Sequence, residues 1–298
     1  MMAENRKRYK GILSIICSAF CFALMNMFVR LAGDIPSVQK SFFRNLVAFF
    51  FAIIIMKKEG IPFAVKKENR KDLILRSTFG TLGILCNFYA VDHLVLADAS
   101  MLNKMSPFFV VLFSFFLLKE KITVPQAVFV AGAFLGSLLV IKPTFSNMDF
   151  LPSLIGLAGG MGAGIAYTFV RKLSLHGEAG PVIVCFFSAF SCIVTLPFLL
   201  FNYHAMSGKQ FVSLLFAGLS AAGGQFGITA AYSYAPAREI SVYDYSQIIF
   251  SALLGFLVFG QIPDWLSWIG YGVICTMALL MFLYNQRKFM NKKGCRVK

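Results

Sequence analysis

The chain has 298 residues, of which 58% are hydrophobic and 14% are charged, and its mean hydropathy is +0.74. This composition excludes an ordinary water-soluble domain and indicates a membrane protein. The formal net charge of +15 raises the question of nucleic-acid binding, but the placement of the basic residues favours contact with anionic lipid headgroups instead.

Long apolar stretches follow one another along almost the whole chain. A bilayer core about 30 Å thick needs ~20 mostly apolar residues per helix. Ten such stretches are predicted, at residues 11–32, 38–56, 73–91, 97–118, 124–141, 152–173, 180–201, 211–232, 240–259 and 265–284. They are continuously apolar, without the strict alternation of membrane strands. The predicted fold class is therefore all-α, a polytopic membrane protein of ten transmembrane helices.

The basic residues are concentrated in alternate connections and in both tails. Of the 28 Lys and Arg residues, 21 lie in the N-terminal tail, the 57–71 loop, the 119–121 turn, positions 171–172, Arg238 and the C-terminal tail. By the positive-inside rule these segments face the cytoplasm. The prediction is a multi-pass protein of the cell membrane, with both termini cytoplasmic, as in a bacterial inner membrane. Anionic lipids at the cytoplasmic face are the predicted partners of this charge, and nucleic acid is not.

The sequence contains a weak internal repeat at a constant offset of 140 residues. In this register Gly83 meets Gly223, Ser106 meets Ser246, and Lys104 meets Asp244. The chain is thus predicted to consist of two five-helix halves, residues 1–146 and 147–298, that form one transport domain. Because five is odd, the second half enters the membrane in the opposite sense. Such inverted repeats are a recurrent basis of alternating access in secondary transporters.

Lys104 and Asp244 are charged residues inside predicted spans. Each lies roughly seven residues from a span end, which at 1.5 Å per residue places both ~10 Å deep, and about 10 Å apart along the membrane normal. An ionised group at mid-membrane costs roughly 2.5 to 3.5 kcal/mol on insertion scales. Each side chain is therefore expected to face water, a partner or a ligand.

Lys104 belongs to a polar, bent segment. Pro107 has no N–H, so it leaves the carbonyl of Asn103 without its helical partner. Irregular backbone in a membrane is tolerated where it lines a cavity or is buried in protein. Asn103 and Lys104 are therefore candidate substrate-binding residues. The alternative is a Lys104 side chain that extends to the outer headgroups beside a structural kink.

The matching segment of the second half, "SVYDYSQIIF", contains a run of polar residues. Asp244 and Gln247, three apart, share one helix face. Asp244 is expected to line a polar cavity or to pair structurally with a Lys or Arg. Tyr243, Tyr245 and Gln247 complete this group of candidate substrate-binding residues.

Arg44 lies some seven residues inside the second predicted span and is the last candidate. It can bind a substrate carboxylate through two parallel hydrogen bonds, or it can hold one helix to another through carbonyl groups or Asp98. Arg30 and Arg76 are close to predicted span ends and are expected at the membrane interface.

Motifs for other functions are missing. The sequence has no HExxH, no paired intramembrane aspartates and no GxSxG nucleophile turn, so an enzyme is not predicted. The stretch "GGMGAG" follows no strand and is not a P-loop. The seven cysteines form no CxxC motif and no cluster with histidine, so no metal site and no cofactor is predicted.

Two segments carry a family resemblance over nearly the whole chain. They are "NFYAVDHLVLADASMLNKMSPFFVVLFSFFLLKEKITVPQAVFVAGAFLGSLLVI" and "AAYSYAPAREISVYDYSQIIFSALLGFLVFGQIPDWLSWIGYGVICTMALLMF". The chain resembles the EamA-type ten-helix permeases of the drug/metabolite transporter superfamily. The first segment has the family's mid-helix Pro107 and a glutamate, Glu120, at the end of the fourth helix. The second departs from the family, because Gln247 replaces the proline and Gly260 the glutamate.

The resemblance implies a helix bundle with a central cavity that moves small metabolites, often amino acids and often outward. It supplies no substrate motif, so the candidate residues rest on the physical interpretation alone. The main hypothesis is a secondary transporter, exporter or exchanger, of a small polar or zwitterionic metabolite, as a monomer or homodimer. Lys104 with Arg44 would bind a carboxylate. Asp244 would bind an amine, helped by the rings of Tyr243 or Tyr245.

Two alternatives remain. The first is an exporter of hydrophobic drugs or organic cations, suggested weakly by the 34 phenylalanines. The second is a non-transporting membrane scaffold or sensor, although the short connections leave no sizeable soluble domain to deliver a signal.

Overall fold

The computed structural model describes residues 2–117, 122–141, 150–234 and 241–294, which are helical apart from their connections and contain no strand. The α-helices are α1 (Met2–Leu31), α2 (Ser37–Glu59), α3 (Arg70–His93), α4 (Leu96–Asn103), α5 (Ser106–Leu117), α6 (Val124–Ile141), α7 (Phe150–Leu175), α8 (Gly180–Phe201), α9 (Gly208–Tyr234), α11 (Ser246–Phe259) and α12 (Trp265–Gly294). Two 3₁₀ turns, η1 (Lys67–Asn69) and η2 (Ser241–Tyr245), precede α3 and α11.

The helices have the length and composition to cross a membrane. Within the part of the chain that the structure describes, nine helical segments are long and apolar enough, among them the combined stretch Leu96–Leu117. The apolar helical segment Tyr243–Phe259 is shorter. It falls in the ninth predicted span, residues 240–259, whose first residue lies outside the described part of the chain. The prediction of an all-α polytopic membrane protein is confirmed.

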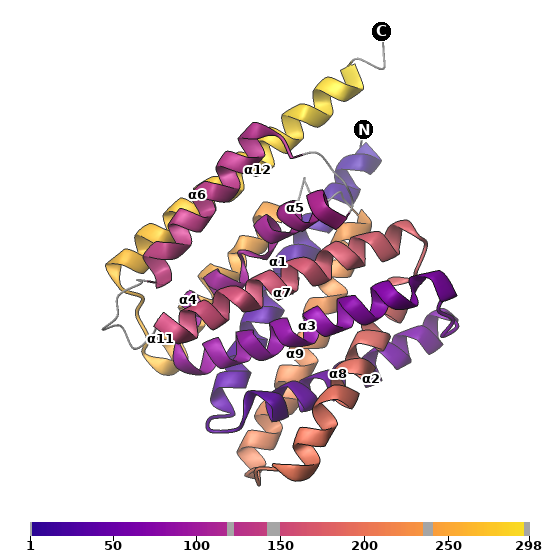
Figure 1. Cartoon of the computed structure of the whole chain (residues 1–298), viewed down its shortest axis with the longest axis vertical. Coiled ribbons are helices and arrows are strands. Elements are labelled where there is room, and N and C mark those ends of the chain that lie inside the picture. Colours follow the sequence, from indigo (N-terminus) through magenta and orange to yellow (C-terminus); the bar gives the residue numbers. More distant parts are fainter. Residues whose placement is uncertain (1, 118–121, 142–149, 235–240, 295–298) are drawn as a thin grey trace.

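Each helix of one half packs mainly against helices of the other half (Figure 1). The most extensive contacts join α1 to α9, α3 to α7, α2 to α8, and α6 to α12. Helices α4 and α5 lie against α7, and α11 lies against α1. Figure 1 shows α6 and α12 side by side at one margin, while the other helices form the main bundle. The interior of the molecule is thus an interface between the first and second halves of the chain.

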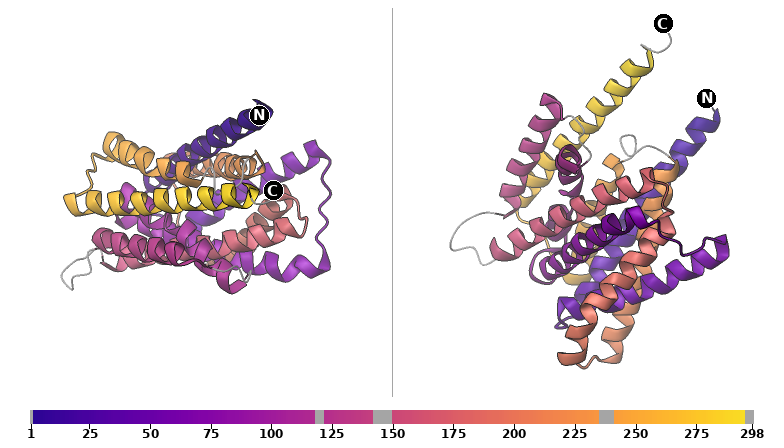
Figure 2. Two further views of the ribbon diagram at one scale, coloured as in Figure 1. Left: turned by 90° about the horizontal axis from the view of Figure 1, so that it is seen from above. Right: turned by 45° about the vertical axis from the view of Figure 1, so that its right-hand side comes forward.

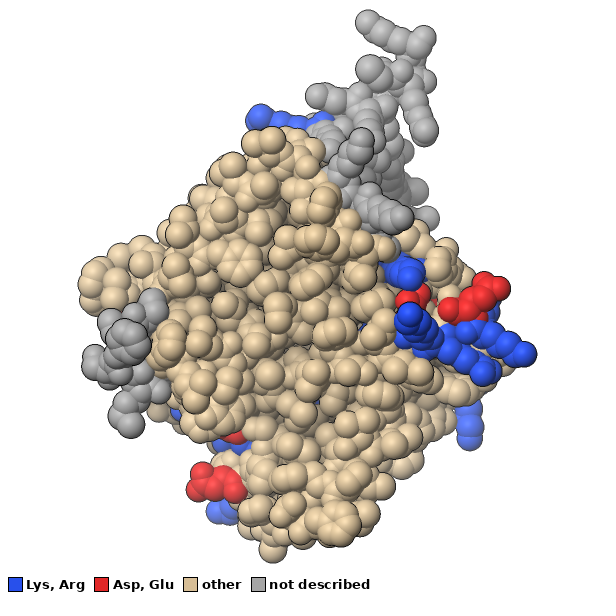
Figure 3. All heavy atoms as spheres, viewed as in Figure 1, with Lys and Arg blue, Asp and Glu red and all other residues tan. Residues whose placement is uncertain are grey.

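The start of α1 and the end of α12 extend from the same end of the bundle (Figure 2). The hairpin of α8 and α9 turns at the opposite end. On the face shown in Figure 3, charged atoms gather at the margins, and a broad band without Lys, Arg, Asp or Glu lies between them. This band is the surface that an apolar bilayer would cover. Large hydrophobic side chains such as Phe50, Ile193 and Leu253 are exposed on the bundle.

The predicted spans that contain Lys104 and Asp244 both depart from regular α-helix at positions related by the repeat offset. In the first half α4 ends at Asn103 and α5 begins at Ser106, as expected from Pro107, which cannot donate to the preceding turn. In the second half the 3₁₀ turn η2 ends at Tyr245 and α11 begins at Ser246. This second break occurs without a proline. Glu120, the glutamate of the family resemblance, lies outside the described residues.

Glycine allows α7 to approach the first break. A Cβ atom added at Gly160 would lie 2.5 Å from the carbonyl oxygen of Leu102 and 3.3 Å from that of Asn103. These are backbone atoms of the last turn of α4, so they cannot move aside as the end of a flexible side chain can. Close packing through small residues is typical of membrane helices.

Replacing Gly160 should therefore separate α7 from α4. We expect Gly160→Val to lower the free energy of unfolding by about 2–3 kcal/mol, as overpacking of a core does, measured as a lower thermal midpoint in detergent. Gly272→Val is the matched control, because a Cβ at Gly272 meets nothing within 4 Å. Equal effects of the two substitutions would contradict the close approach.

Candidate functional site

A polar cavity lies inside the main bundle and encloses about 680 Å³ of space between atoms, counting the part open to solvent. Its walls come from α1, α2, α3 and the α4–α5 break of the first half, and from α7, α8, α9 and α11 of the second. The charged and amide side chains that line it are Asn26, Arg44, Arg76, Asn87, Asn103, Lys104, Gln225 and Gln247. Four of the seven candidate residues, Arg44, Asn103, Lys104 and Gln247, are in this wall.

Lys104 and Asp244 form a buried ion pair between the two halves. The Nζ atom of Lys104 lies 2.5 Å from Oδ2 of Asp244, and both side chains are less than a tenth exposed. Lys104 does not extend to the headgroups. The two depths along the membrane normal stay a prediction, and the long lysine side chain bridges the distance between the two backbones. The lysine sits where α4 has ended, its side chain reaches ~6 Å, and Asp244 lies in a 3₁₀ turn, which rises faster than an α-helix.

The ion pair is supported by one further contact. The hydroxyl of Tyr245 donates to the carbonyl oxygen of Lys104 over 3.1 Å, so the second half supplies a hydrogen bond to the irregular backbone beside Pro107. Oδ1 of Asp244 is buried and accepts no hydrogen bond among the described residues. The carboxylate therefore keeps capacity for one more donor.

The two candidate tyrosines do not line the cavity. Tyr245 is buried and bonded to the α4–α5 break. Tyr243 is partly buried and packs near Ile15 of α1 and Ala231 of α9. Neither ring is among the lining residues, so in this conformation neither lies where it would contact a ligand in the cavity.

Arg44 is buried, with 1% of its surface exposed. Its Nη1 donates to the side chain of its neighbour Asn45 over 2.6 Å, and Asn45 in turn donates to Ser191 of α8 over 2.9 Å. No described acidic residue pairs with Arg44. In particular, Asp98 accepts a hydrogen bond from the hydroxyl of Tyr271 over 2.6 Å. The alternative in which Arg44 holds two helices together through Asp98 is not seen.

Arg76 is the residue that the sequence interpretation missed. It was expected at the membrane interface, but it is only 4% exposed and lines the cavity. The helix α3 begins at Arg70, before the predicted span at residue 73, so Arg76 lies nearly two turns after the start of the helix. A periodic signal was available: Arg76, Gly80, Gly83 and Asn87 are spaced for one face of a helix, and all four line the cavity.

The two arginines lie over one aromatic ring. The guanidinium carbon of Arg76 is 3.7 Å from the ring centroid of Phe187, and that of Arg44 is 6.0 Å from it. Gly80 makes room for this arrangement, since a Cβ there would lie 3.0 Å from the Phe187 ring and 3.2 Å from Nη1 of Arg76. Nε of Arg44, and Nε and Nη1 of Arg76, are buried without a hydrogen-bond partner.

A chain of polar side chains leads from the cavity into the bundle. Asn87 donates to Asn26 over 3.2 Å, Asn26 donates to Ser100 over 3.4 Å, and Ser100 donates to Ser251 over 2.7 Å. These four residues come from α3, α1, α4 and α11, so the chain connects the two halves. The Oδ1 atom of Asn87 is buried and accepts no hydrogen bond.

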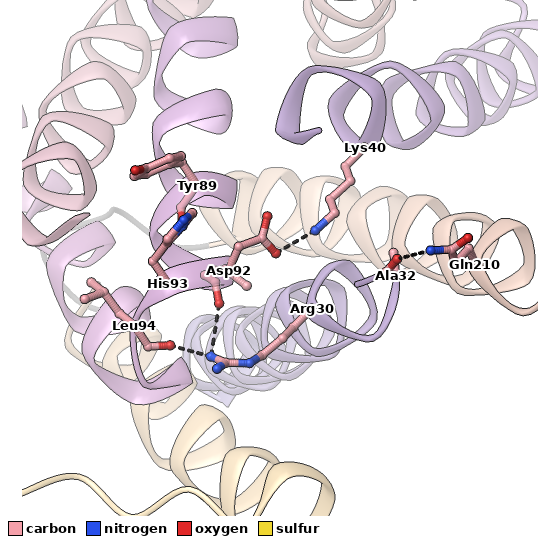
Figure 4. A network of polar contacts seen from close by, with 9 residues as sticks. Arg30, Ala32, Lys40, Tyr89, Asp92, His93, Leu94 and Gln210 are labelled. Carbon is pink, nitrogen blue, oxygen red and sulfur yellow. Dashed lines mark hydrogen bonds and ion pairs between the residues drawn. The ribbon is translucent and has the colours of Figure 1, made fainter. Parts of the chain in front are cut away.

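The helix ends opposite the termini are tied together by a second polar network (Figure 4). Lys40 of α2 is fully buried and lies 2.6 Å from Oδ1 of Asp92 on α3. Arg30 of α1 donates to the carbonyl oxygens of Val91 and Leu94. Gln210 of α9 donates to the carbonyl of Ala32 over 3.1 Å. These contacts hold four helices that also surround the cavity.

The Lys40–Asp92 pair is expected to contribute to stability. Lys40→Met leaves the carboxylate of Asp92 without its partner in a mostly buried place, so we expect a loss of about 1–3 kcal/mol in the free energy of unfolding. The measurement is the thermal midpoint in detergent. Lys209→Met, which removes an exposed lysine, is the control and should change it little. A midpoint unchanged in Lys40→Met would contradict the assignment.

The opposite end of the bundle also has cross-links. Lys172 of α7 lies 2.9 Å from Asp72 of α3. Glu178 accepts hydrogen bonds from the side chain of Asn69 over 2.8 Å and from the backbone N–H of Lys66 over 3.2 Å. The loop before α3 is thereby attached to the turn between α7 and α8.

Comparison with known proteins agrees with this architecture. The EamA-like transporter family matches residues 9–142 and again residues 151–283. The pseudopaline exporter CntI of Pseudomonas aeruginosa PAO1 is 32% identical over 275 residues, covering 91% of this chain and 94% of the exporter. Human solute carrier family 35 member G1 is 26% identical, over 90% of this chain and 77% of that protein. A riboflavin transporter of Vibrio cholerae is 23% identical, over 98% and 99%.

One solved crystal structure aligns with a TM-score of 0.67 at 17% identity, covering 93% of this chain and 98% of that one. At this level of identity the match shows a shared fold. The relatives are transporters, and the resemblance inferred from the sequence is confirmed.

Proposed function

Because this chain belongs to the EamA-like transporter family, we propose that it is a secondary transporter, an exporter or exchanger, of a small polar or zwitterionic metabolite. The observation that carries this proposal is the cavity between the two halves, which is lined by the buried side chains of Arg44, Arg76 and Lys104. Charged residues at such depth are costly and mark substrate pathways.

Alternating access through an inverted repeat is part of the proposal. Three observations support it. The two family matches fall on either side of the proposed boundary at 146 and 147. The helix breaks at 104–105 and 241–245 are related by the repeat offset. The contacts of α1 with α9 and of α7 with α3 exchange when the halves are exchanged. Opening between the two halves at the end opposite the termini would require the contact of Gln210 with Ala32, which joins α9 to the end of α1, to separate.

The candidate residues take different roles in the proposed site. Arg44 and Lys104 would meet a substrate carboxylate, and Asn103 and Gln247 would supply neutral hydrogen bonds. Asp244 would meet an amine only through its open Oδ1 atom, because Oδ2 is bonded to Lys104. Substrate binding and ion pairing at Asp244 are then competing events, and such competition offers a way to connect binding with movement of the two halves.

The charge of the cavity disfavours the alternative of an exporter of organic cations. Its lining includes three basic side chains and no acidic one, and Asp244 is occupied by Lys104. A cation entering this cavity would meet like charge in a medium of low dielectric constant. A scaffold without transport would have no use for a charged cavity of this kind.

Solute counterflow in proteoliposomes tests the proposal. Vesicles loaded with a candidate metabolite should accumulate the labelled compound from outside when they contain the protein, and not when they are empty. An amino-acid and metabolite panel is the appropriate set of probes, because the named functions of the relatives differ. Uptake confined to lipophilic cations would favour the alternative exporter, and no counterflow by any compound would contradict transport of these classes.

The proposed orientation places both termini in the cytoplasm of a bacterial cell, with the basic ends of the helices against anionic lipid. The basic tails and the shared location of the two helix ends support it. Reporter fusions at the two ends test it, and signals from opposite sides of the membrane would contradict the fold as well as the orientation. Asp244 is the proposed proton carrier if transport is proton-coupled. In that case Asp244→Asn should abolish the response of flux to a pH gradient.

A further inference from the structure

The charges around the cavity do not balance. Lys104 and Asp244 neutralise each other over 2.5 Å. Arg44 and Arg76 remain, and among the described residues no carboxylate pairs with either. Both guanidinium groups are nearly inaccessible to solvent, with relative exposures of 1% and 4% for the two residues. An excess of two positive charges in a buried place is expensive unless an anion binds there.

The unused donors of the two arginines are grouped. Three of their nitrogen atoms are buried without a hydrogen-bond partner, namely Nε of Arg44 and both Nε and Nη1 of Arg76. The ring of Phe187 lies under both guanidinium carbons and takes up part of the space around them. The planar fork of an arginine matches the oxygens of a carboxylate or phosphate through two parallel hydrogen bonds. The arrangement therefore offers one wall of the cavity to an anionic group.

Further along the same face of α3, the side chain of Asn87 offers a hydrogen-bond acceptor instead of a donor. Asn87 lies eleven residues after Arg76 on α3, and its Oδ1 atom is buried without a donor. Its amide nitrogen is already committed to Asn26. A ligand that reaches this position can present an N–H or O–H group. The site thus has anion-binding donors near Phe187 and an acceptor further along α3.

We propose that the substrate is a small molecule with at least two negative charges, carried by carboxylate or phosphate groups, and that Arg44 and Arg76 together bind one of these groups. This inference rests on the proposed function and narrows its substrate class from polar or zwitterionic to net anionic. Arg76 becomes the principal specificity residue, because two of its nitrogen atoms lack a partner and it makes no hydrogen bond to a side chain of the described residues.

The test is the thermal midpoint of the purified protein in detergent at constant ionic strength. The anionic probes are succinate, citrate, inorganic phosphate and glycerol 3-phosphate, and the matched probes without negative charge are succinamide and putrescine. We expect at least one dianion to raise the midpoint saturably, with no shift from the matched probes. A shift with the carboxylates or with the phosphates identifies the anionic group.

Two substitutions locate the effect. Arg76→Met should weaken binding of the effective dianion at least tenfold, and Arg70→Met, which removes an exposed arginine from the same helix, should not. Arg76→Lys keeps the charge without the planar fork and should give intermediate affinity, so a folding defect of the methionine variant would not leave the question open. The inference is overturned if no dianion shifts the parent, if putrescine or succinamide does so equally, or if the Arg76 variants bind like the parent. Phosphatidylglycerol is added as a lipid probe in the same assay. A thermal midpoint raised by this lipid and by none of the soluble anions overturns the assignment to a soluble substrate.

Counterflow separates failure of this inference from failure of the proposed function. If a dianion binds to the protein but shows no counterflow, the anion site is supported and transport of that compound is contradicted. If a neutral or cationic metabolite shows counterflow and Arg76→Met does not change it, transport is supported and the anion site is contradicted.

Discussion

Lys104→Met should lower the free energy of unfolding by about 3–5 kcal/mol, the usual cost of removing one partner of a buried ion pair. The reason is that Asp244 would keep its charge in the interior of the bundle with neither oxygen bonded, since Oδ1 already lacks a donor. Asp244→Leu should cost a similar amount for the converse reason. Thermal unfolding in detergent measures both, with exposed Lys71→Met and Asp34→Asn as controls.

The double variant Lys104→Met/Asp244→Leu decides what the pair is for. Replacing both charges by apolar groups of similar size is often neutral for stability, so the double variant should recover most of the midpoint that each single variant loses. If it is stable and carries no solute, the pair takes part in transport. If it is stable and transports like the parent, the pair is structural and the proposed binding roles of Lys104 and Asp244 are wrong.

Arg76→Met should make the ligand-free protein more stable, by about 1–2 kcal/mol. The wild-type side chain leaves two buried N–H groups unsatisfied, and each such group costs about 1–3 kcal/mol. The contact with the Phe187 ring offsets part of this cost, and methionine retains the apolar stem of the side chain. A gain in stability together with a loss of ligand binding is the signature of a residue kept for function.

The same measurement on Arg44→Met provides a comparison. Arg44 donates to Asn45, so its removal leaves the Oδ1 atom of Asn45 without that donor, and the gain in stability should be smaller. Arg70→Met is the surface control and should change the midpoint little. If Arg76→Met destabilises the ligand-free protein by several kcal/mol, the arginine is part of the structural framework and the inference of an anion site loses its main support.

The candidate site was only partly accessible from the sequence. The repeat register placed Lys104 opposite Asp244, and the two side chains do meet. Tyr243 and Tyr245 were included because they are adjacent to Asp244. Adjacent residues point in different directions around a turn. The ring of Tyr243 lies toward α1, and that of Tyr245 lies toward the backbone of the α4–α5 break.

Arg76 shows why the rest of the candidate site could not be predicted from the positions of the hydrophobic spans. A hydropathy window places a helix end within a few residues, and for an arginine near such an end the interface and the interior are equally good expectations. What decided the matter was Phe187 of α8, over a hundred residues away, whose ring lies beside Gly80 and under both guanidinium groups. No local pattern contains that contact.

By itself, the sequence determined the membrane location and the all-helical class, because apolar stretches long enough to cross a bilayer permit few other structures. The family followed from the resemblance carried by two long segments. The sequence also determined the break at Pro107, because a missing N–H has a local consequence. Only the tertiary structure decided which buried charges neutralise one another and which stay open. That outcome depends on distances between helices from different halves of the chain, and a few ångströms separate an ion pair from a binding site.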